Sequence, residues 1–261
     1  MVPPPAPTLV LVPGFMQRGR AWAPLADRLP ERYRRLCLDL GASTWSDRLA
    51  ELRAAAPSGG VLVGYSMGGR LALHAALDEP GRFAGVVTVG ASAGIEDPAA
   101  REERRRADER LAAWIETRSI DEVVARWERL PVFATQSPEL VAAQRADRLS
   151  HDPSALACLL RTGGQGALDP VWHRLPDLPT PLLAVAGERD AKYADAARRV
   201  AALAPSGEAT VVADAGHAAH LERPRSVAEV IEGFVERTCR TPAPGPGFPD
   251  RRADRPARGP G

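Results

Sequence analysis

The sequence predicts an α/β fold: a mostly parallel central sheet flanked by helices, with a helical cap inserted into the chain. Short β-type runs alternate with helical stretches, which is the pattern of parallel sheets. From about residue 97 to residue 160, strand signals vanish and helix signals dominate. The apolar run at 61–63 leads through a serine flanked by glycines straight into a helix. With 261 residues, the chain has the size of one such domain plus an insertion.

Six short β-type runs are expected to form the sheet. They lie at residues 8–12, 36–38, 61–63, 86–89, 182–186 and 210–212. Helical stretches alternate with these runs, so the strands are expected to pair in parallel. After the last run, Val227, Val230, Ile231 and Phe234 fall at helical spacing and predict a closing amphipathic helix.

Four helix starts indicate that the inserted segment is a helical cap. Ser119 and Glu122 form a capping box, in which the serine caps the helix and the glutamate lies three residues further on. Asp97, Ser137 and Asp152 are each followed by proline, so a capping side chain precedes the residue favoured at the first helical position. We therefore expect several short helices in the cap.

The chain is expected to divide into five segments. These are a flexible N-terminal segment (1–7), a first part of the α/β core (8–96), the cap (97–165), a second part of the core (166–240) and a disordered tail (241–261). The tail lacks the apolar content that offsets the entropy of ordering. The first apolar run is too short for a signal sequence or a membrane span, so we expect a cytoplasmic protein without membrane insertion.

Charge and cysteine content narrow the class of partner. The formal net charge is +1, which gives no bulk attraction for nucleic acid or an anionic membrane. Cys37, Cys158 and Cys239 have neither a metal-ligand spacing nor the density of a disulfide scaffold, and they suggest a reducing compartment. We expect a small-molecule partner, with no metal, no cofactor and no nucleic acid. The oligomeric state is left open.

Ser66 is the predicted reactive residue. It stands in the run Gly64-Tyr65-Ser66-Met67-Gly68, between a strand and a helix. Such a nucleophile elbow needs glycines on both sides, because the turn is too tight for a Cβ and holds the serine in a strained backbone conformation. The strand-to-helix context strengthens a pentapeptide that is by itself a weak signal.

An acid and then a histidine are expected downstream of the elbow, each on a loop after a late strand. Asp190 follows the run at 182–186, and His217 follows the run at 210–212. The imidazole of His217 would take the proton of Ser66, while Asp190 fixes the tautomer of the histidine and stabilises its charged form. These three residues are the predicted catalytic triad.

Four neighbouring residues are alternatives for these roles. Asp214 lies too close in sequence to the histidine to orient it from behind, and Glu188 precedes the turn. His74 lies within the elbow helix and is expected to be a packing residue. His220 is expected to support the histidine loop.

Two backbone N–H groups are expected to stabilise developing negative charge. One belongs to Met67 at the start of the elbow helix, and the other to Phe15 in the loop after the first strand. Pro13 has no N–H of its own, but the expected donor lies two residues later, so this oxyanion hole need not be broken.

Arginines suggest the class of substrate. Most arginines of the run from Arg101 to Arg106 are expected to be solvated or paired with neighbouring acidic residues. Arg70, one turn into the elbow helix, and Arg104 are the exceptions. A guanidinium facing the cleft binds a carboxylate through two hydrogen bonds, so these residues indicate an acidic substrate.

The chain resembles the 2-succinyl-6-hydroxy-2,4-cyclohexadiene-1-carboxylate synthases (MenH) of the α/β-hydrolase superfamily, from residue 8 to residue 234. The matching segments are residues 64–70, 101–104 with Asp108, 127–134, 187–193 and 215–217. The cap segment at 127–134 and the arginines at the cap entrance are more specific than the elbow. The resemblance implies a lyase step of menaquinone biosynthesis, in which proton abstraction expels pyruvate from 2-succinyl-5-enolpyruvyl-6-hydroxy-3-cyclohexene-1-carboxylate.

Family roles carried over by position assign the triad and the two oxyanion donors as above. They also assign contacts with a carboxylate-rich substrate to Tyr65, Arg70, Arg104, Trp127, Arg148 and Lys192. Arg145 stands three residues before Arg148, about one helical turn away. Either arginine is therefore an alternative for the same substrate contact. Lys192 is equally well explained as a surface lysine of the loop.

The chain departs from the family at two places that shape one wall of the pocket. The family's His-Gly is replaced by Pro13-Gly14, and its Pro-Gly-His-Gly by residues 40–43, which begin with Leu40-Gly41. The alternative function is therefore a serine hydrolase of a small carboxylate-bearing ester, thioester or carbon–carbon substrate. A binding module that has lost turnover is a third hypothesis, against which the complete triad argues.

Overall fold

Six parallel strands form the central sheet of the computed structural model, which describes residues 7–239. The strands are β1 (Thr8–Val12), β2 (Arg34–Cys37), β3 (Val61–Tyr65), β4 (Gly85–Val89), β5 (Leu182–Gly187) and β6 (Gly207–Val212). Their order across the sheet is β2-β1-β3-β4-β5-β6, and every neighbouring pair is parallel. The predicted fold class is confirmed.

The two edge strands differ in their bounds from the prediction. β2 begins at Arg34 and ends at Cys37 instead of spanning 36–38, and β6 begins at Gly207 instead of residue 210. Most residues of both strands are partly exposed, so an apolar run does not mark their full length. The predicted flexible segment 1–7, except Pro7, and the predicted tail 241–261 lie outside the described residues.

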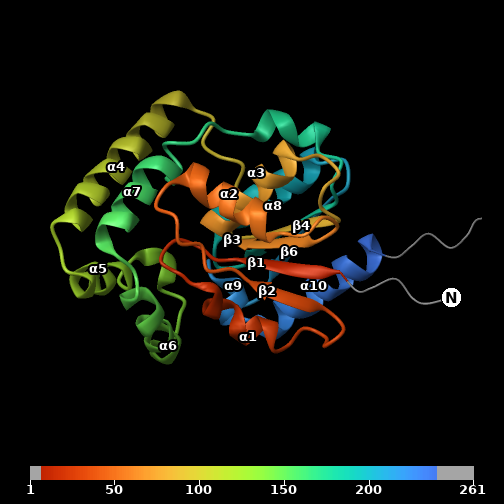
Figure 1. The fold of residues 1–261 in the computed structure, drawn as a ribbon, viewed down its shortest axis with the longest axis horizontal. Coiled ribbons are helices and arrows are strands. Elements are labelled where there is room, and N and C mark those ends of the chain that lie inside the picture. Colours follow the sequence, from red (N-terminus) through yellow and green to blue (C-terminus); the bar gives the residue numbers. More distant parts are fainter. Residues whose placement is uncertain (1–6, 240–261) are drawn as a thin grey trace, which may run out of the picture.

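Helices cover both faces of the sheet (Figure 1). One face carries α2 (Trp45–Ala55), α3 (Met67–Asp78) and α8 (Ala191–Leu203), and the other carries α1 (Ala23–Ala26), α9 (Ala219–Glu222) and α10 (Pro224–Thr238). Side chains of β1 alternate between the two layers: Val10 and Val12 pack in the first core, Leu9 and Leu11 in the second. The sequence positions 227, 230, 231 and 234, predicted to form a closing helix, lie within α10.

Four helices lie between β4 and β5 and form a separate layer beside the sheet (Figure 1). They are α4 (Pro98–Glu116), α5 (Ile120–Trp127), α6 (Pro138–Leu149) and α7 (Pro153–Gly163). Each is preceded by a predicted N-cap residue, and Ser119 and Glu122 form both hydrogen bonds of the capping box. We propose that this segment is the cap predicted at 97–165.

The several short helices expected here are α5, α6 and α7, with 8, 12 and 11 residues, whereas α4 is longer, with 19 residues. Its residues after the first proline are mainly Ala, Arg and Glu, which favour helix, and no glycine or further proline interrupts them. Short 3₁₀ turns connect other elements at Gly19–Trp22, Pro131–Phe133 and Trp172–Asp177. Between residues 7 and 239, no helix is both long and apolar enough to cross a membrane.

Candidate active site

Ser66 occupies a strained turn between β3 and α3. Its φ is +49° and its ψ is −108°, a conformation that side chains rarely adopt. A Cβ at Gly64 would lie 2.2 Å from the carbonyl oxygen of Gly68, and one at Gly68 would lie 2.2 Å from the carbonyl oxygen of Val12. Both glycines are therefore required for the turn, which projects the serine side chain from the end of the strand.

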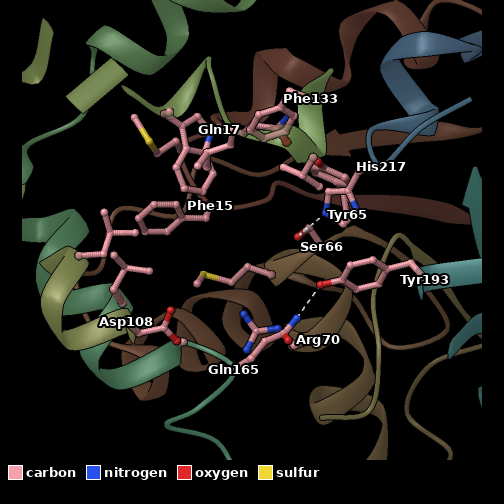
Figure 2. A pocket seen from close by; sticks show the side chains of 18 of the residues that line it. Phe15, Gln17, Tyr65, Ser66, Arg70, Asp108, Phe133, Gln165, Tyr193 and His217 are labelled. Atoms are coloured by element: carbon pink, nitrogen blue, oxygen red, sulfur yellow. Dashed lines mark hydrogen bonds between the residues drawn. The ribbon is translucent and has the colours of Figure 1, made fainter. Parts of the chain in front are cut away.

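His217 lies within hydrogen-bonding distance of both Ser66 and Asp190. His217 Nε2 is 3.2 Å from Ser66 Oγ, and His217 Nδ1 is 2.7 Å from Asp190 Oδ2. The three residues follow β3, β6 and β5 at the carboxyl edge of the sheet. The imidazole is buried, with 7% of its side chain exposed. Figure 2 shows Ser66 and His217 side by side, joined by their hydrogen bond, in the lining of a cavity.

Phe15 and Met67 line the same cavity as Ser66. Met67 is the first residue of α3, so its N–H has no partner within the helix. The loop with Phe15 is closed by Gln17, which donates its N–H to the carbonyl of Gly14 at 3.3 Å and accepts the N–H of Gly14 at 3.2 Å. No described residue accepts the N–H of Phe15. Both amides are thus free to meet negative charge in the cavity.

The cavity has a volume of about 380 Å³ and lies between the sheet edge and the four-helix layer. Every residue predicted to contact substrate lines it: Tyr65, Arg70, Arg104, Trp127, Arg148 and Lys192. The lining therefore contains four cationic side chains, those of Arg70, Arg104, Arg148 and Lys192, but only two carboxylates, those of Asp108 and Asp190. An anionic molecule is favoured in such a site over a neutral or cationic one.

Arg70 is buried deep in the cavity wall, with 7% of its surface exposed. It donates a hydrogen bond of 2.8 Å to the carbonyl oxygen of Gly163, and its guanidinium lies over the ring of Trp45, 5.4 Å from the ring centroid. Burial lowers the pKa of Arg70 to about 10. The side chain is still protonated at neutral pH. Because its hydrogen-bond partner is a neutral carbonyl, Arg70 brings a positive charge to the site.

Arg104 reaches the cavity from α4 and is held by Asp108, one turn further along the helix. Its Nε lies 2.8 Å from Asp108 Oδ1. Within the described part of the chain, no acceptor binds its two terminal nitrogens. The contact therefore orients the arginine and leaves its outer edge available to a ligand.

Arg148, not Arg145, faces the cavity. Its Nη1 lies 3.3 Å from Glu128 Oε1, and its Nη2 donates a hydrogen bond of 3.0 Å to Gln144 Oε1. Arg145 pairs with the other oxygen of Glu128. Burial is the main cause of a lowered pKa of Arg148. One carboxylate is thus shared by two arginines, which leaves positive charge on the inner one.

Aromatic rings hold the imidazole of His217 from two sides. Its ring centroid lies 5.4 Å from that of Tyr65 and 4.6 Å from that of Tyr193. Burial raises the pKa of Tyr65, which keeps its hydroxyl neutral. Three further aromatic residues line the cavity together: the ring centroid of Trp127 lies 5.2 Å from that of Phe15 and 5.7 Å from that of Phe133.

The other histidines and acids near the elbow lie outside the triad. His74 packs edge-on against Trp45, with centroids 5.3 Å apart. His220 is fully buried and packs against the rings of both Trp22 and Tyr65 in a tilted arrangement. Asp214 pairs with the side chain of Arg189. The carboxylate of Glu188 accepts the N–H of Asp214, so it binds the loop and not the imidazole.

Several cavity residues were not predicted from the sequence as site residues. Gln17, Gln144, Gln165, Phe133 and Tyr193 all line the cavity. Phe133 and Tyr193 lie within segments that carry the family resemblance, which is a usable signal. The three glutamines carry no charge and follow no spacing pattern. Among residues 7–239, no group of three or more His, Cys, Asp or Glu side chains is arranged to hold a metal ion.

The model of the alpha/beta hydrolase family matches residues 9–230. A curated relative from Salmonella heidelberg, named 2-succinyl-6-hydroxy-2,4-cyclohexadiene-1-carboxylate synthase, is 33% identical over 241 residues, which cover 87% of this chain and 93% of the relative. The chain belongs to the α/β hydrolase family, and within that family it is similar to the 2-succinyl-6-hydroxy-2,4-cyclohexadiene-1-carboxylate synthases. A second synthase of the same name, from Salmonella schwarzengrund, matches to the same extent.

Solved structures agree with this membership. The structure of MenH from S. aureus is similar with a TM-score of 0.83 and 27% identity, over 90% of this chain and 95% of that one. A thermophilic esterase from Thermogutta terrifontis has a TM-score of 0.74 and 23% identity, over 89% and 90% of the two chains. The esterase shows that the hydrolase fold is shared, whereas the synthases share both the fold and substantial sequence.

Proposed function

We propose that this member of the synthase family eliminates pyruvate from 2-succinyl-5-enolpyruvyl-6-hydroxy-3-cyclohexene-1-carboxylate and leaves 2-succinyl-6-hydroxy-2,4-cyclohexadiene-1-carboxylate. The observation that carries this proposal is the placement of Ser66 and His217 in one cavity with three arginines and a lysine. The named synthases support the reaction class. The reaction is a lyase step of menaquinone biosynthesis, and the partner is a small acidic molecule in the cytoplasm.

The first step is removal of the proton from ring carbon 2 of the substrate. His217 accepts the hydroxyl proton of Ser66 through Nε2, and the serine oxygen takes the carbon-bound proton. Asp190, hydrogen-bonded to Nδ1, keeps the free nitrogen toward the serine and stabilises the imidazolium that forms. Ser66 acts as a base in this scheme, and no acyl-enzyme forms.

Negative charge then develops on the carbonyl oxygen of the succinyl group, because carbon 2 is adjacent to that carbonyl. The backbone N–H groups of Phe15 and Met67 are the donors proposed for this oxygen. Removing one such donor costs an acyl-transfer enzyme about 10²–10³ in rate, so these two groups supply a substantial part of the barrier reduction.

The double bonds then shift to carbons 2–3 and 4–5, and the bond from carbon 5 to the enolpyruvyl oxygen breaks. Pyruvate departs as its enolate and takes up the proton that the imidazolium returns. Atoms and electrons balance without an external oxidant or reductant. Arg70, Arg104 and Arg148 are proposed to bind the carboxylates of the substrate, with Tyr65, Trp127 and Lys192 as further contacts.

A serine hydrolase is the second candidate, because the same contact between His217 and Ser66 serves acyl transfer. Mass spectrometry of the protein during turnover separates the two. Elimination leaves the mass of the enzyme unchanged while the absorbance of the conjugated diene product grows. A transient adduct on Ser66, without diene formation, would replace the lyase by a hydrolase.

A further inference from the structure

The hydroxyl of Tyr193 lies in the cavity wall between the proposed base and a buried arginine. Tyr193 is in the first turn of α8, three residues after Asp190, and its ring packs on the imidazole of His217 with centroids 4.6 Å apart. The hydroxyl oxygen lies 2.7 Å from Nε2 of Gln165. Figure 2 shows this oxygen directed toward Gln165 and Arg70 across the cavity.

The chemistry of the amide sets the direction of this hydrogen bond. An amide nitrogen has hydrogens and no free acceptor pair, so Gln165 donates and the oxygen of Tyr193 accepts. A phenol has one proton of its own, and no acceptor within the described residues binds it. The hydroxyl proton of Tyr193 therefore remains available to a ligand in the cavity.

The loop that holds Gln165 is fixed against the cap helix α4. A Cβ at Gly166 would lie 2.2 Å from the backbone nitrogen of Arg105, and one at Gly164 would lie 2.4 Å from Asp108 Oδ2. Gln165 itself is buried, with 7% of its surface exposed. Gly163, the last residue of α7 directly before this loop, supplies the carbonyl that anchors Arg70. Residues 163–166 thus orient two hydrogen-bond donors: the charged guanidinium of Arg70 and the neutral hydroxyl of Tyr193.

We propose that Tyr193 is a substrate-binding residue, whose hydroxyl donates a hydrogen bond to a carboxylate oxygen of the substrate bound beside Arg70. A carboxylate suits this position because it offers only acceptors and meets both donors. The inference rests on the proposed function for the acidic class of the substrate. It adds a residue that the predicted substrate contacts do not include.

Binding of 2-succinylbenzoate tests the inference. This dicarboxylate keeps the succinyl arm and the ring carboxylate but has no enolpyruvyl group, so it binds without elimination. Calorimetric titration of Tyr193→Phe, which loses the hydroxyl and retains the ring on His217, is expected to give a Kd about 10- to 100-fold higher than that of the wild type. Tyr33→Phe is the matched control. Tyr33 is buried in the opposite core layer, and its variant is expected to bind like the wild type.

Gln165→Leu tests the orientation of the hydroxyl. We expect it to weaken binding by less than Tyr193→Phe, and the double variant to bind no more weakly than Tyr193→Phe alone, because both changes act through one hydroxyl. Fully additive losses would overturn the role assigned to Gln165. An unchanged Kd for Tyr193→Phe, or no measurable binding by the wild type, would overturn the inference itself.

Steady-state kinetics separate an effect of Tyr193 on substrate binding from an effect on catalysis. They also test the role of Tyr193 separately from the proposed lyase function. With the enolpyruvyl substrate, Tyr193→Phe is expected to raise KM while kcat stays close to that of the wild type. A fall in kcat with an unchanged Kd would mean that the hydroxyl acts on His217, and would contradict the inference. If the wild type releases no pyruvate, the proposed function fails, but the comparison of dissociation constants still decides the role of Tyr193.

Discussion

Asp190 Oδ2 lies 2.7 Å from Nδ1 of His217 and joins two loops that are separated by a whole helix and strand. The carboxylate accepts the Nδ1 proton, so the Nε2 lone pair points toward Ser66, 3.2 Å away. The side chain of Asp190 is 14% exposed, which limits competition from water. This contact determines which tautomer of the histidine serves the reaction.

Asp190→Asn is therefore expected to lower kcat by roughly 10⁴-fold, because the amide donates a hydrogen bond and favours the wrong tautomer. The variant is expected to keep the circular dichroism spectrum of the wild type. Asp214→Asn is the control, because Asp214 pairs with Arg189 and not with the imidazole. A loss of less than tenfold in kcat for Asp190→Asn would contradict the proposed base.

Arg145→Ala tests whether the negative charge of Glu128 is shared between Arg145 and Arg148. Arg145 lies outside the cavity lining, but it binds one oxygen of Glu128 while Arg148 binds the other. Without Arg145, the whole carboxylate is available to Arg148 and neutralises more of its charge. We expect KM for the anionic substrate to rise by about 3- to 10-fold, which corresponds to a pair energy of roughly 1 kcal/mol.

Arg129→Ala is the matched control for this change, because Arg129 is an exposed arginine of the same region that forms no ion pair with a described residue. Its removal changes the net charge equally and is expected to leave KM within twofold. Equal effects of the two variants would show that only long-range charge matters, and not the sharing of Glu128.

Buried histidines are expected to make stability depend on pH. Burial lowers the pKa of His74 and His151 to about 4 and that of His220 to about 3. The unfolded chain, with histidine pKa values near 6.5, binds these protons first as the pH falls. The stabilisation from the neutral rings is thus complete above about pH 6.5 and is lost as the pH falls toward these lowered values.

His220→Phe isolates one of these contributions. Neither ring nitrogen of His220 has a hydrogen-bond partner among the described residues, so phenylalanine loses no such bond. We measure the free energy of unfolding in urea at several pH values between 6.5 and 4 and plot it against pH. The slope for His220→Phe is expected to be shallower than that of the wild type by up to about 1.4 kcal/mol per pH unit. A slope equal to that of the wild type would refute the assigned protonation.

Gly68→Ala is expected to destabilise the elbow. Its Cβ would lie 2.2 Å from the backbone oxygen of Val12, which cannot move without displacing β1. We expect a loss of about 1–3 kcal/mol or more in thermal or urea unfolding. Gly41→Ala is the control, since the nearest atom to its Cβ is the end of the Glu51 side chain at 3.8 Å. Equal stability of the two variants would contradict the close packing at the elbow.

Much of the fold could be predicted because buried strands and helix caps leave local patterns. The central strands are nearly continuous apolar runs. The four helices between β4 and β5 have the N-caps Asp97, Ser119, Ser137 and Asp152, whose side chains accept backbone N–H groups. The edge strands were less predictable. Their partly exposed side chains follow no continuous apolar run, so only their ends were recognised.

The cavity residues were predictable only where charge or motif marks them. Arg145 and Arg148 lie three residues apart on α6, so the sequence alone left both open. The packing of that helix places Arg148 inward. Gln165 was missed because its role comes from glycines pressed against α4, a contact between segments that are far apart in the chain. Tertiary contacts of this kind leave no periodic signal in the sequence.

Pyruvate release from 2-succinyl-5-enolpyruvyl-6-hydroxy-3-cyclohexene-1-carboxylate tests the central claim most directly. A lactate dehydrogenase couple measures pyruvate while absorbance measures the diene, for the wild type and for Ser66→Ala. We expect the two products in equal amounts from the wild type, and a rate at least about 10³-fold lower from Ser66→Ala. Wild-type release no faster than the uncatalysed reaction, or equal rates for both proteins, would contradict the account.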